Sequence, residues 1–153
     1  MIYTDFSKAF DKVETGVLLH KVRDCKITGK VGTWLASFLD SASRQQAVAV
    51  DGVVSDLMQV LSGVPQGTVL GPILFLIHIM DIASDLSSGT TATSFADDTR
   101  VQRGISSSQD CLCLQNDLQN IYNWAKTVNM HFNSDKFECF RFWPHSDNIP
   151  AHD

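Results

Sequence analysis

The spacing of apolar residues predicts two helices in the first quarter of the chain. Thr15 can cap the first helix through its hydroxyl group. Apolar side chains then fall on one side of this helix: Leu18, Leu19, Val22 and Cys25. Gly29 separates it from a second helix, whose apolar residues recur at helical spacing and are expected in the core: Val31, Trp34, Leu35 and Phe38.

Strand signals occur at the start of the chain and again after the second helix. Residues 1–4 form a short β-prone run that ends at Asp5. Residues 44–50 are also β-prone, and Asp51-Gly52 is a strong two-residue hairpin turn. Residues 53–60 then form the predicted returning strand.

A glycine- and proline-rich loop over residues 62–67 precedes the longest apolar run, residues 69–80. This run predicts a buried helix. It is well short of the roughly 20 apolar residues that cross a bilayer, and no secretory signal is visible. The sequence therefore predicts a protein without a membrane partner.

The second half predicts a hairpin, a long helix and a final strand. Residues 91–96 and 99–102 flank Asp97-Asp98, which would lie at the hairpin tip. A helix starting at the serines of 106–108 has apolar residues at helical spacing: Cys111, Leu114, Leu118, Ile121, Ala125 and Val128. Residues 137–142 are β-prone. The mixture of helices with an antiparallel hairpin predicts an α+β fold.

Composition limits the possible functions. The 153 residues suit one domain, and 44% of them are hydrophobic. The formal net charge of −5 has the wrong sign for a free nucleic-acid binder. Six basic residues nevertheless crowd into the early part, either as a solvated helix face, which we favour, or as a phosphate-contacting edge: Lys8, Lys12, Lys21, Arg23, Lys26 and Lys30.

The four cysteines do not predict a metal site. Cys111 and Cys113 are separated by one residue, without the gap of two to four residues found in zinc sites. His131, Cys139 and His145 do not complete one. The sequence predicts reduced and mostly buried thiols in an intracellular protein.

The adjacent carboxylates of Asp97 and Asp98 are the most informative chemical feature. Two negative charges about 4 Å apart repel by about 4 kcal/mol at an effective dielectric of 20. A divalent cation is a common way to offset such repulsion, although a solvated turn would also contain aspartates. Taken alone, the pair would favour the solvated turn.

Three sequence segments, which occur in a fixed order along the chain, favour the cation site over the solvated turn. They are DFSKAFD from Asp5 to Asp11, SGVPQGTVLGP from Ser62 to Pro72, and FADD ending at Asp98. Together they resemble three motifs of the reverse transcriptases, most closely those of non-LTR, LINE-like retrotransposons. The resemblance covers residues 2–142 and implies a polymerase palm, in which an antiparallel sheet packs on helices.

The resemblance implies a set of metal ligands. Asp5 and Asp97 would be the main ligands, Asp98 a less direct one, and the backbone carbonyl of Phe6 would complete one shell. The implied cofactors are two Mg²⁺ ions, which Mn²⁺ could replace. Two such ions support in-line nucleotidyl transfer by activating the attacking hydroxyl and stabilising the developing charge. Asp11 is expected to be a structural residue at a helix start.

The resemblance also implies nucleotide contacts. Phe10 would exclude a ribose 2′ hydroxyl, and the loop with Gln66 and Gly67 would lie beside the incoming nucleotide. Lys136 would support the pyrophosphate leaving group, with an ordinary surface lysine as an equal alternative. Phe10 alone would be core, and the loop alone an ordinary turn.

The implied partners are an RNA template, a DNA primer and deoxynucleoside triphosphates. Residues 1–143 would form a partial palm domain and residues 144–153 a polar tail, with the fingers and thumb largely missing. We therefore expect weak or no activity from this chain alone. A non-enzymatic palm remnant or interaction module is the main alternative, and a group II intron maturase or telomerase a weaker one. Nucleus and cytoplasm are both open as locations.

Overall fold

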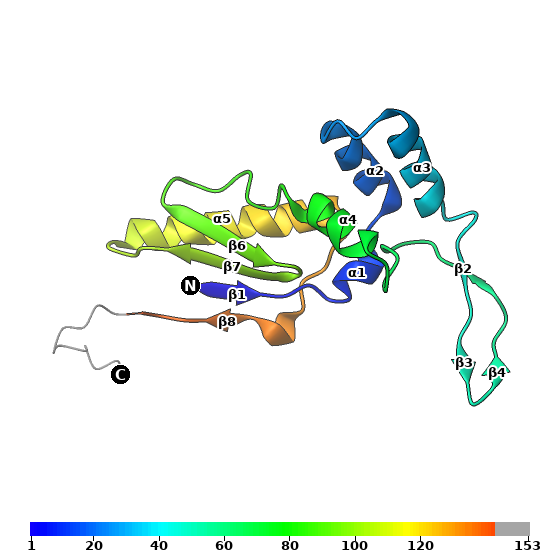
Figure 1. The fold of residues 1–153 in the computed structure, drawn as a ribbon. Helices are drawn as coiled ribbons and strands as arrows, with labels where there is room; N and C mark the ends of the chain where they lie inside the picture. Colours follow the sequence, from blue (N-terminus) through cyan, green and yellow to red (C-terminus); the bar gives the residue numbers. More distant parts are fainter. Residues whose placement is uncertain (143–153) are drawn as a thin grey trace.

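A four-stranded antiparallel sheet forms one half of the computed structural model, which describes residues 1–142 (Figure 1). Its strands lie in the order β6-β7-β1-β8. Their bounds are Thr90–Phe95 for β6, Asp98–Arg103 for β7, Ile2–Thr4 for β1 and Glu138–Cys139 for β8. Strand β1 is therefore a central strand, and Thr4 lies opposite Thr99 of β7.

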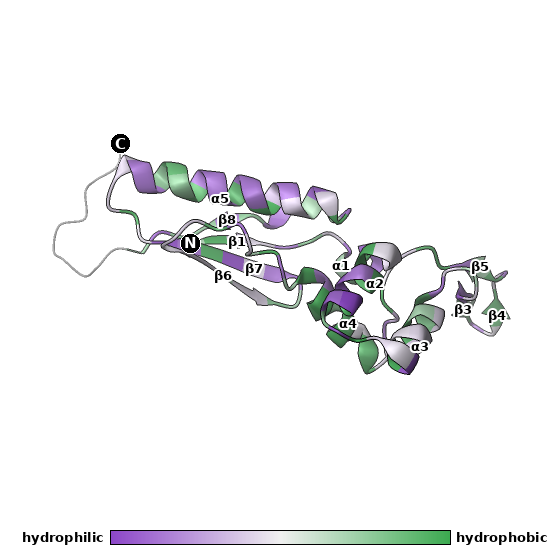
Figure 2. Cartoon of the chain, turned by 90° about the horizontal axis from the view of Figure 1, so that it is seen from above, coloured by the Kyte–Doolittle hydropathy of each residue, from purple (hydrophilic) through white to green (hydrophobic). Residues whose placement is uncertain are grey.

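The long helix α5 (Ser108–Thr127) covers one face of the sheet, as seen from above in Figure 2. Side chains alternate across a strand, so Val101 faces the helix and is fully buried, whereas Arg100 and Gln102 are exposed. Ser107 caps the helix reciprocally with Asp110, which confirms the helix start predicted at residues 106–108.

Four helices form the other half of the molecule. They are α1 (Ala9–Lys12), α2 (Thr15–Asp24), α3 (Gly29–Leu39) and α4 (Leu70–Ile79). Leu18, Leu39 and Phe75 are fully buried where these helices pack together. A single-turn 3₁₀ helix, η1 (Ser134–Lys136), follows α5 and leads into β8.

Between α3 and α4 the chain forms a long arm, residues 44–61, that projects away from the body of the molecule (Figure 1). It contains four two-residue strands: β2 (Gln45–Gln46), β3 (Ala49–Val50), β4 (Val53–Val54) and β5 (Met58–Gln59). Val50 pairs with Val53 around Asp51-Gly52, which confirms the predicted hairpin. The paired segments are shorter than predicted, and these valines are exposed.

The predicted α+β class is confirmed. The predicted cap of α2 is wrong by one residue, because Glu14 precedes the helix and accepts hydrogen bonds from the amides of Gly16 and Val17. A carboxylate with two oxygens satisfies two free amides, whereas the hydroxyl of Thr15 would satisfy one.

Several burial predictions are also wrong. Val31 and Trp34 are 58% and 53% exposed, because only the side of α3 with Leu35 and Leu39 meets the core. Helix α4 is buried on one side only, and Ile73 and Leu76 are about half exposed. Among residues 1–142, Cys113 is partly buried and the other thiols are exposed: Cys25, Cys111 and Cys139.

For Lys21, both interpretations of the early basic residues, a solvated helix face and a phosphate-contacting edge, are wrong. Lys21 is buried and forms an ion pair with Asp81. Near the end of the described residues, Phe142 is 75% exposed. The β-prone run 137–142 contributes only the two residues of β8. Trp143 and the predicted tail 144–153 lie outside the described residues.

Candidate active site

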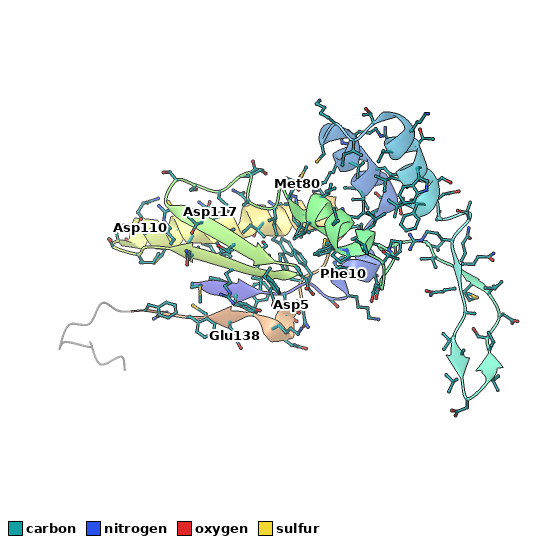
Figure 3. All side chains as sticks on the ribbon, viewed as in Figure 1. Asp5, Phe10, Met80, Asp110, Asp117 and Glu138 are labelled. Atoms are coloured by element: carbon teal, nitrogen blue, oxygen red, sulfur yellow. The ribbon has the colours of Figure 1, made fainter. Side chains whose placement is uncertain are left out.

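Asp5 lies immediately after β1, beside the turn that joins β6 to β7 (Figure 3). Thr4 pairs with Thr99, so the next position along β1 lies beside Asp98, the first residue of β7. The turn itself consists of Ala96 and Asp97, one residue earlier than the predicted tip at Asp97-Asp98, and Ala96 has a φ of 53°. Residues more than 90 positions apart thereby bring three carboxylates to one edge of the sheet.

The backbone around Asp5 is fixed by the chain that follows α5. The carbonyl oxygen of Asp5 accepts a hydrogen bond from the amide of Asn133 at 2.8 Å. The ring of Phe6 is buried and stacks on Phe132, with 4.4 Å between ring centroids. Asp5 is itself only 3% exposed, so its carboxylate has little freedom to move.

Lys136 reaches the same place from η1. Its Nζ lies 2.5 Å from Oδ2 of Asp5, while its side chain is 60% exposed and the Asp5 side chain 4%. The hydrogen bond and charge of Asp5, with smaller effects of Asp97 and Asp98, raise the pKa of Lys136. The ammonium group is therefore charged at neutral pH and lies in the field of all three carboxylates.

The carboxylates also act on one another. Partial burial, and after it the charges of Asp5 and Asp98, raises the pKa of Asp97. A hydrogen bond from Tyr3 to Asp98 raises the pKa of Tyr3. The guanidinium of Arg100 lies 5.6 Å from the centre of the Tyr3 ring. Negative charge is thus concentrated at this edge and is only partly balanced.

Within residues 1–142 no three His, Cys, Asp or Glu side chains are already arranged as a metal-binding group. The residues at this edge nonetheless suit Mg²⁺ chemically, because the candidate ligands are all oxygen atoms and their charges are incompletely compensated. The charge of Asp5 contributes to the raised pKa of Asp97, as expected for two carboxylates that lie near each other. The donor set therefore fits a hard divalent cation.

The Gly/Pro-rich loop 62–67 packs directly on α1. The amide of Val64 donates to the carbonyl of Phe10 at 2.9 Å, and the hydroxyl of Ser62 donates to the carbonyl of Asp11 at 2.8 Å. Gly63 and Gly67 have φ angles of 89° and 74°, a region that L side chains resist. A Cβ on Gly63 would lie 2.9 Å from the Cα of Asp11.

The predicted nucleotide contacts come from these two segments. Phe10 is partly buried and stacks on Phe75 of α4, with 4.3 Å between centroids, so it also serves the core (Figure 3). Gln66 and Gly67 are exposed. The amide nitrogen of Gln66 donates to Oδ1 of Asp11 at 2.6 Å.

Sequence reasoning missed two residues of this region. Tyr3 lies two positions before Asp5, so the alternation of a strand would have placed both on one face. Asp11 was assigned to a helix start, yet it is exposed and its side chain contacts the loop. No local pattern in the sequence indicates that contact, because it joins positions 55 residues apart.

Comparison with known proteins gives the family of the chain. Residues 1–149 match the family described as Reverse transcriptase (RNA-dependent DNA polymerase). The chain belongs to the reverse transcriptase family. It is 32% identical to the RNA-directed DNA polymerase from mobile element jockey of Drosophila melanogaster, over 97% of this chain and 17% of that protein. It is 30% identical to the probable RNA-directed DNA polymerase from transposon X-element of the same species, over 91% of this chain and 16% of that protein.

These matches confirm the resemblance to the non-LTR retrotransposon group. The α+β structure is compatible with a partial reverse transcriptase palm. Reverse transcriptases generally use divalent metal ions and act on nucleic acid templates and nucleotides. The chain spans about one sixth of the length of the curated relatives it matches. None of the helices within residues 1–142 is long and apolar enough to cross a membrane.

Proposed function

We propose that this chain is the palm of an RNA-directed DNA polymerase of a non-LTR retrotransposon. The observation that carries the proposal is the meeting of Asp5, from the first motif, with Asp97, from the third, at one sheet edge. Its substrates would be deoxynucleoside triphosphates, and its partners an RNA template and a DNA primer.

Asp5 and Asp97 would hold two Mg²⁺ ions, with support from Asp98 and the backbone carbonyl of Phe6. When bound, such ions acidify the attacking hydroxyl and stabilise the charge of an in-line phosphoryl transfer. The buried backbone of Asp5 keeps its carboxylate at the end of β1, where it can meet the β6–β7 turn without rearrangement.

The other residues would bind and orient substrate. Phe10, held by its stack on Phe75, would limit the space beside the sugar. The loop with Gln66 and Gly67 would lie against the nucleotide, because its open backbone leaves room for close approach. The exposed ammonium of Lys136 would leave its ion pair with Asp5 and bind the pyrophosphate leaving group, whose negative charge it would offset.

Metal binding tests the site directly. Titration with Mn²⁺, followed by the loss of free Mn²⁺ signal in electron paramagnetic resonance, should show binding by the native chain. Asp97→Asn should weaken it by at least the roughly 10–100-fold that losing an outer partner of a metal site costs. Asp85→Asn, a change at an exposed aspartate outside the site, is the matched control and should bind like the native chain. Equal binding by the native chain and Asp97→Asn would reject the site.

Primer extension tests the activity. With an RNA template, an annealed DNA primer and deoxynucleotides, this chain should give at most weak extension. Asp5→Asn and Asp97→Asn should abolish that extension, and Asp85→Asn should leave it unchanged. Metal binding without any extension, under conditions in which a related reverse transcriptase extends the same primer, would favour the non-enzymatic palm fragment.

A further inference from the structure

The loop 62–67 and helix α1 are joined in two different ways. Main-chain groups make the first connection, in which Gly63 donates to Val13 at 2.8 Å and Val64 donates to Phe10 at 2.9 Å. Arg44 adds a hydrogen bond to the carbonyl of Gly63 at 2.9 Å. These contacts involve no side chain of α1, so a substitution within α1 leaves them in place.

The second connection depends on a side chain. Oδ1 of Asp11 accepts a 2.6 Å hydrogen bond from Nε2 of Gln66, and both residues are exposed at the surface. A charged acceptor makes this bond stronger than one between neutral groups. Because the two residues bury little surface, the bond is expected to contribute more to the orientation of Gln66 than to the stability of the fold.

The chemistry of the pair fixes which end of the Gln66 amide is presented. An ionised carboxylate only accepts hydrogen bonds, so the NH₂ group of Gln66 must face Asp11. The carbonyl oxygen of the same amide then points away from Asp11 and is left to accept a hydrogen bond from a ligand. Without Asp11, the amide could rotate and present either end.

We infer that Asp11 is a positioning residue that orients the Gln66 amide, and thereby its carbonyl oxygen, toward the incoming nucleotide. This inference rests on the proposed function, because it requires that Gln66 meet a nucleotide. Asp11 follows Phe10, the other predicted nucleotide contact, so one short helix would set the positions of both. Asp11 itself does not touch substrate in this arrangement.

A double-mutant cycle on nucleotide affinity tests the role. Equilibrium dialysis of labelled dATP with Mg²⁺ is measured for the native chain, Asp11→Ala, Gln66→Ala and the double variant. Loss of a charge-assisted hydrogen bond at an exposed site predicts about tenfold weaker dATP binding by Asp11→Ala. In the Gln66→Ala background the same change should have less than a twofold effect, since Asp11 acts through Gln66. A purely structural role would give equal effects in both backgrounds.

Two further variants complete the design. Asp56→Ala lies on the arm, and the Asp56 side chain makes no hydrogen bond to any residue of 1–142. This variant is the matched control and should bind dATP like the native chain. If Asp11→Ala fails to fold in urea titration, Asp11→Asn takes its place, with about threefold weaker binding, because asparagine can turn either end of its amide to Gln66.

The outcomes separate the two proposals. Native binding of dATP with no change in the Asp11 variant, or with equal losses in both backgrounds, overturns the role of Asp11 and leaves the proposed function standing. A native chain that binds no dATP in the presence of Mg²⁺ overturns the proposed function itself, and the role of Asp11 with it.

Discussion

Lys21 of α2 and Asp81, which follows α4, form an ion pair with 2.5 Å between Nζ and Oδ1. Lys21 also donates to the carbonyl of His78 at 2.6 Å, and the indole of Trp124 donates to the same oxygen of Asp81 at 3.0 Å. The ammonium group lies 5.1 Å from the centre of the Trp124 ring. This network joins α2, α4 and α5.

Breaking this ion pair should destabilise the protein unequally from its two sides. Asp81→Ala leaves the buried ammonium of Lys21 without its counter-charge and should cost about 3–5 kcal/mol of unfolding free energy. Lys21→Met should cost less, because Asp81 is 42% exposed and the methionine refills the space of the lysine stem. Urea unfolding measures both. As a control, His20→Ala removes an exposed pair with Asp24 and should cost about 0.5 kcal/mol of unfolding free energy or less. If Lys21→Met lost more unfolding free energy than Asp81→Ala, the result would contradict the described network.

His78 should make stability fall in mild acid. Burial, and then the charge of Lys21, lowers the pKa of His78 from 6.5 to about 4. Both ring nitrogens are buried without a hydrogen-bond partner among the described residues. Between pH 6.5 and 4 the unfolded chain binds a proton at His78 that the folded protein does not. The contribution of neutral His78 to the unfolding free energy should therefore be fully present above pH 6.5. The unfolding free energy should fall by about 3 kcal/mol when the pH is lowered to 4.

Urea unfolding of the native chain and His78→Leu across pH 4–7.5 isolates this contribution. The difference in unfolding free energy between the two proteins should change by about 3 kcal/mol in favour of the variant as the pH falls. Parallel pH profiles would show that His78 is not held neutral in the folded protein.

Two glycines of the loop 62–67 offer a matched pair. Gly63→Ala and Gly67→Ala each force alanine into a left-handed conformation, which costs roughly 1–2 kcal/mol. The Cβ at position 67 meets open space, whereas the one at position 63 would press on the backbone of Asp11 and Phe10. Gly63→Ala should therefore lose clearly more unfolding free energy in thermal or urea titration. Equal losses would mean that the loop does not pack on α1 as described.

Asp117 should hold the connection between α4 and β6. Its fully buried carboxylate accepts hydrogen bonds from the amide of Ser87 and the hydroxyl of Thr90. Burial acts to raise the pKa of Asp117, but these hydrogen bonds outweigh it and lower the pKa. Asp117→Ala leaves both donors without their acceptor and should lower the unfolding free energy by about 3 kcal/mol, measured by urea unfolding. Asn116→Ala, at the exposed neighbouring position, should stay within about 0.5 kcal/mol of the native chain.

Local signals predicted the parts of the fold that local chemistry determines. The Asp51-Gly52 turn and the serine start of α5 each follow from the conformations of a few residues. The meeting of Asp5 with the β6–β7 turn was implied by family resemblance, because nothing near either segment specifies their pairing.

Burial was harder to predict because it depends on which neighbours are present. The stripe on α3 has the right spacing for a core helix, yet Trp34 stacks on Phe38 at the surface, since α3 packs on α2 along only one side. Lys21 was grouped with solvated lysines because its counter-charge lies 60 residues away. The contact between Asp11 and Gln66 could not be predicted from local patterns either, because the two residues lie 55 positions apart.

The central place of β1 in the sheet has a consequence for how the protein folds. Its partners are β7 and β8, which both come later in the chain, so β1 must wait for about a hundred further residues before either neighbour exists. Contacts of such sequence separation form slowly, whereas α2 and α3 are neighbours in the chain and can associate early. During synthesis the helical half would therefore form first, and the carboxylate edge would be assembled last, when the closing strands arrive on either side of residues 2–4.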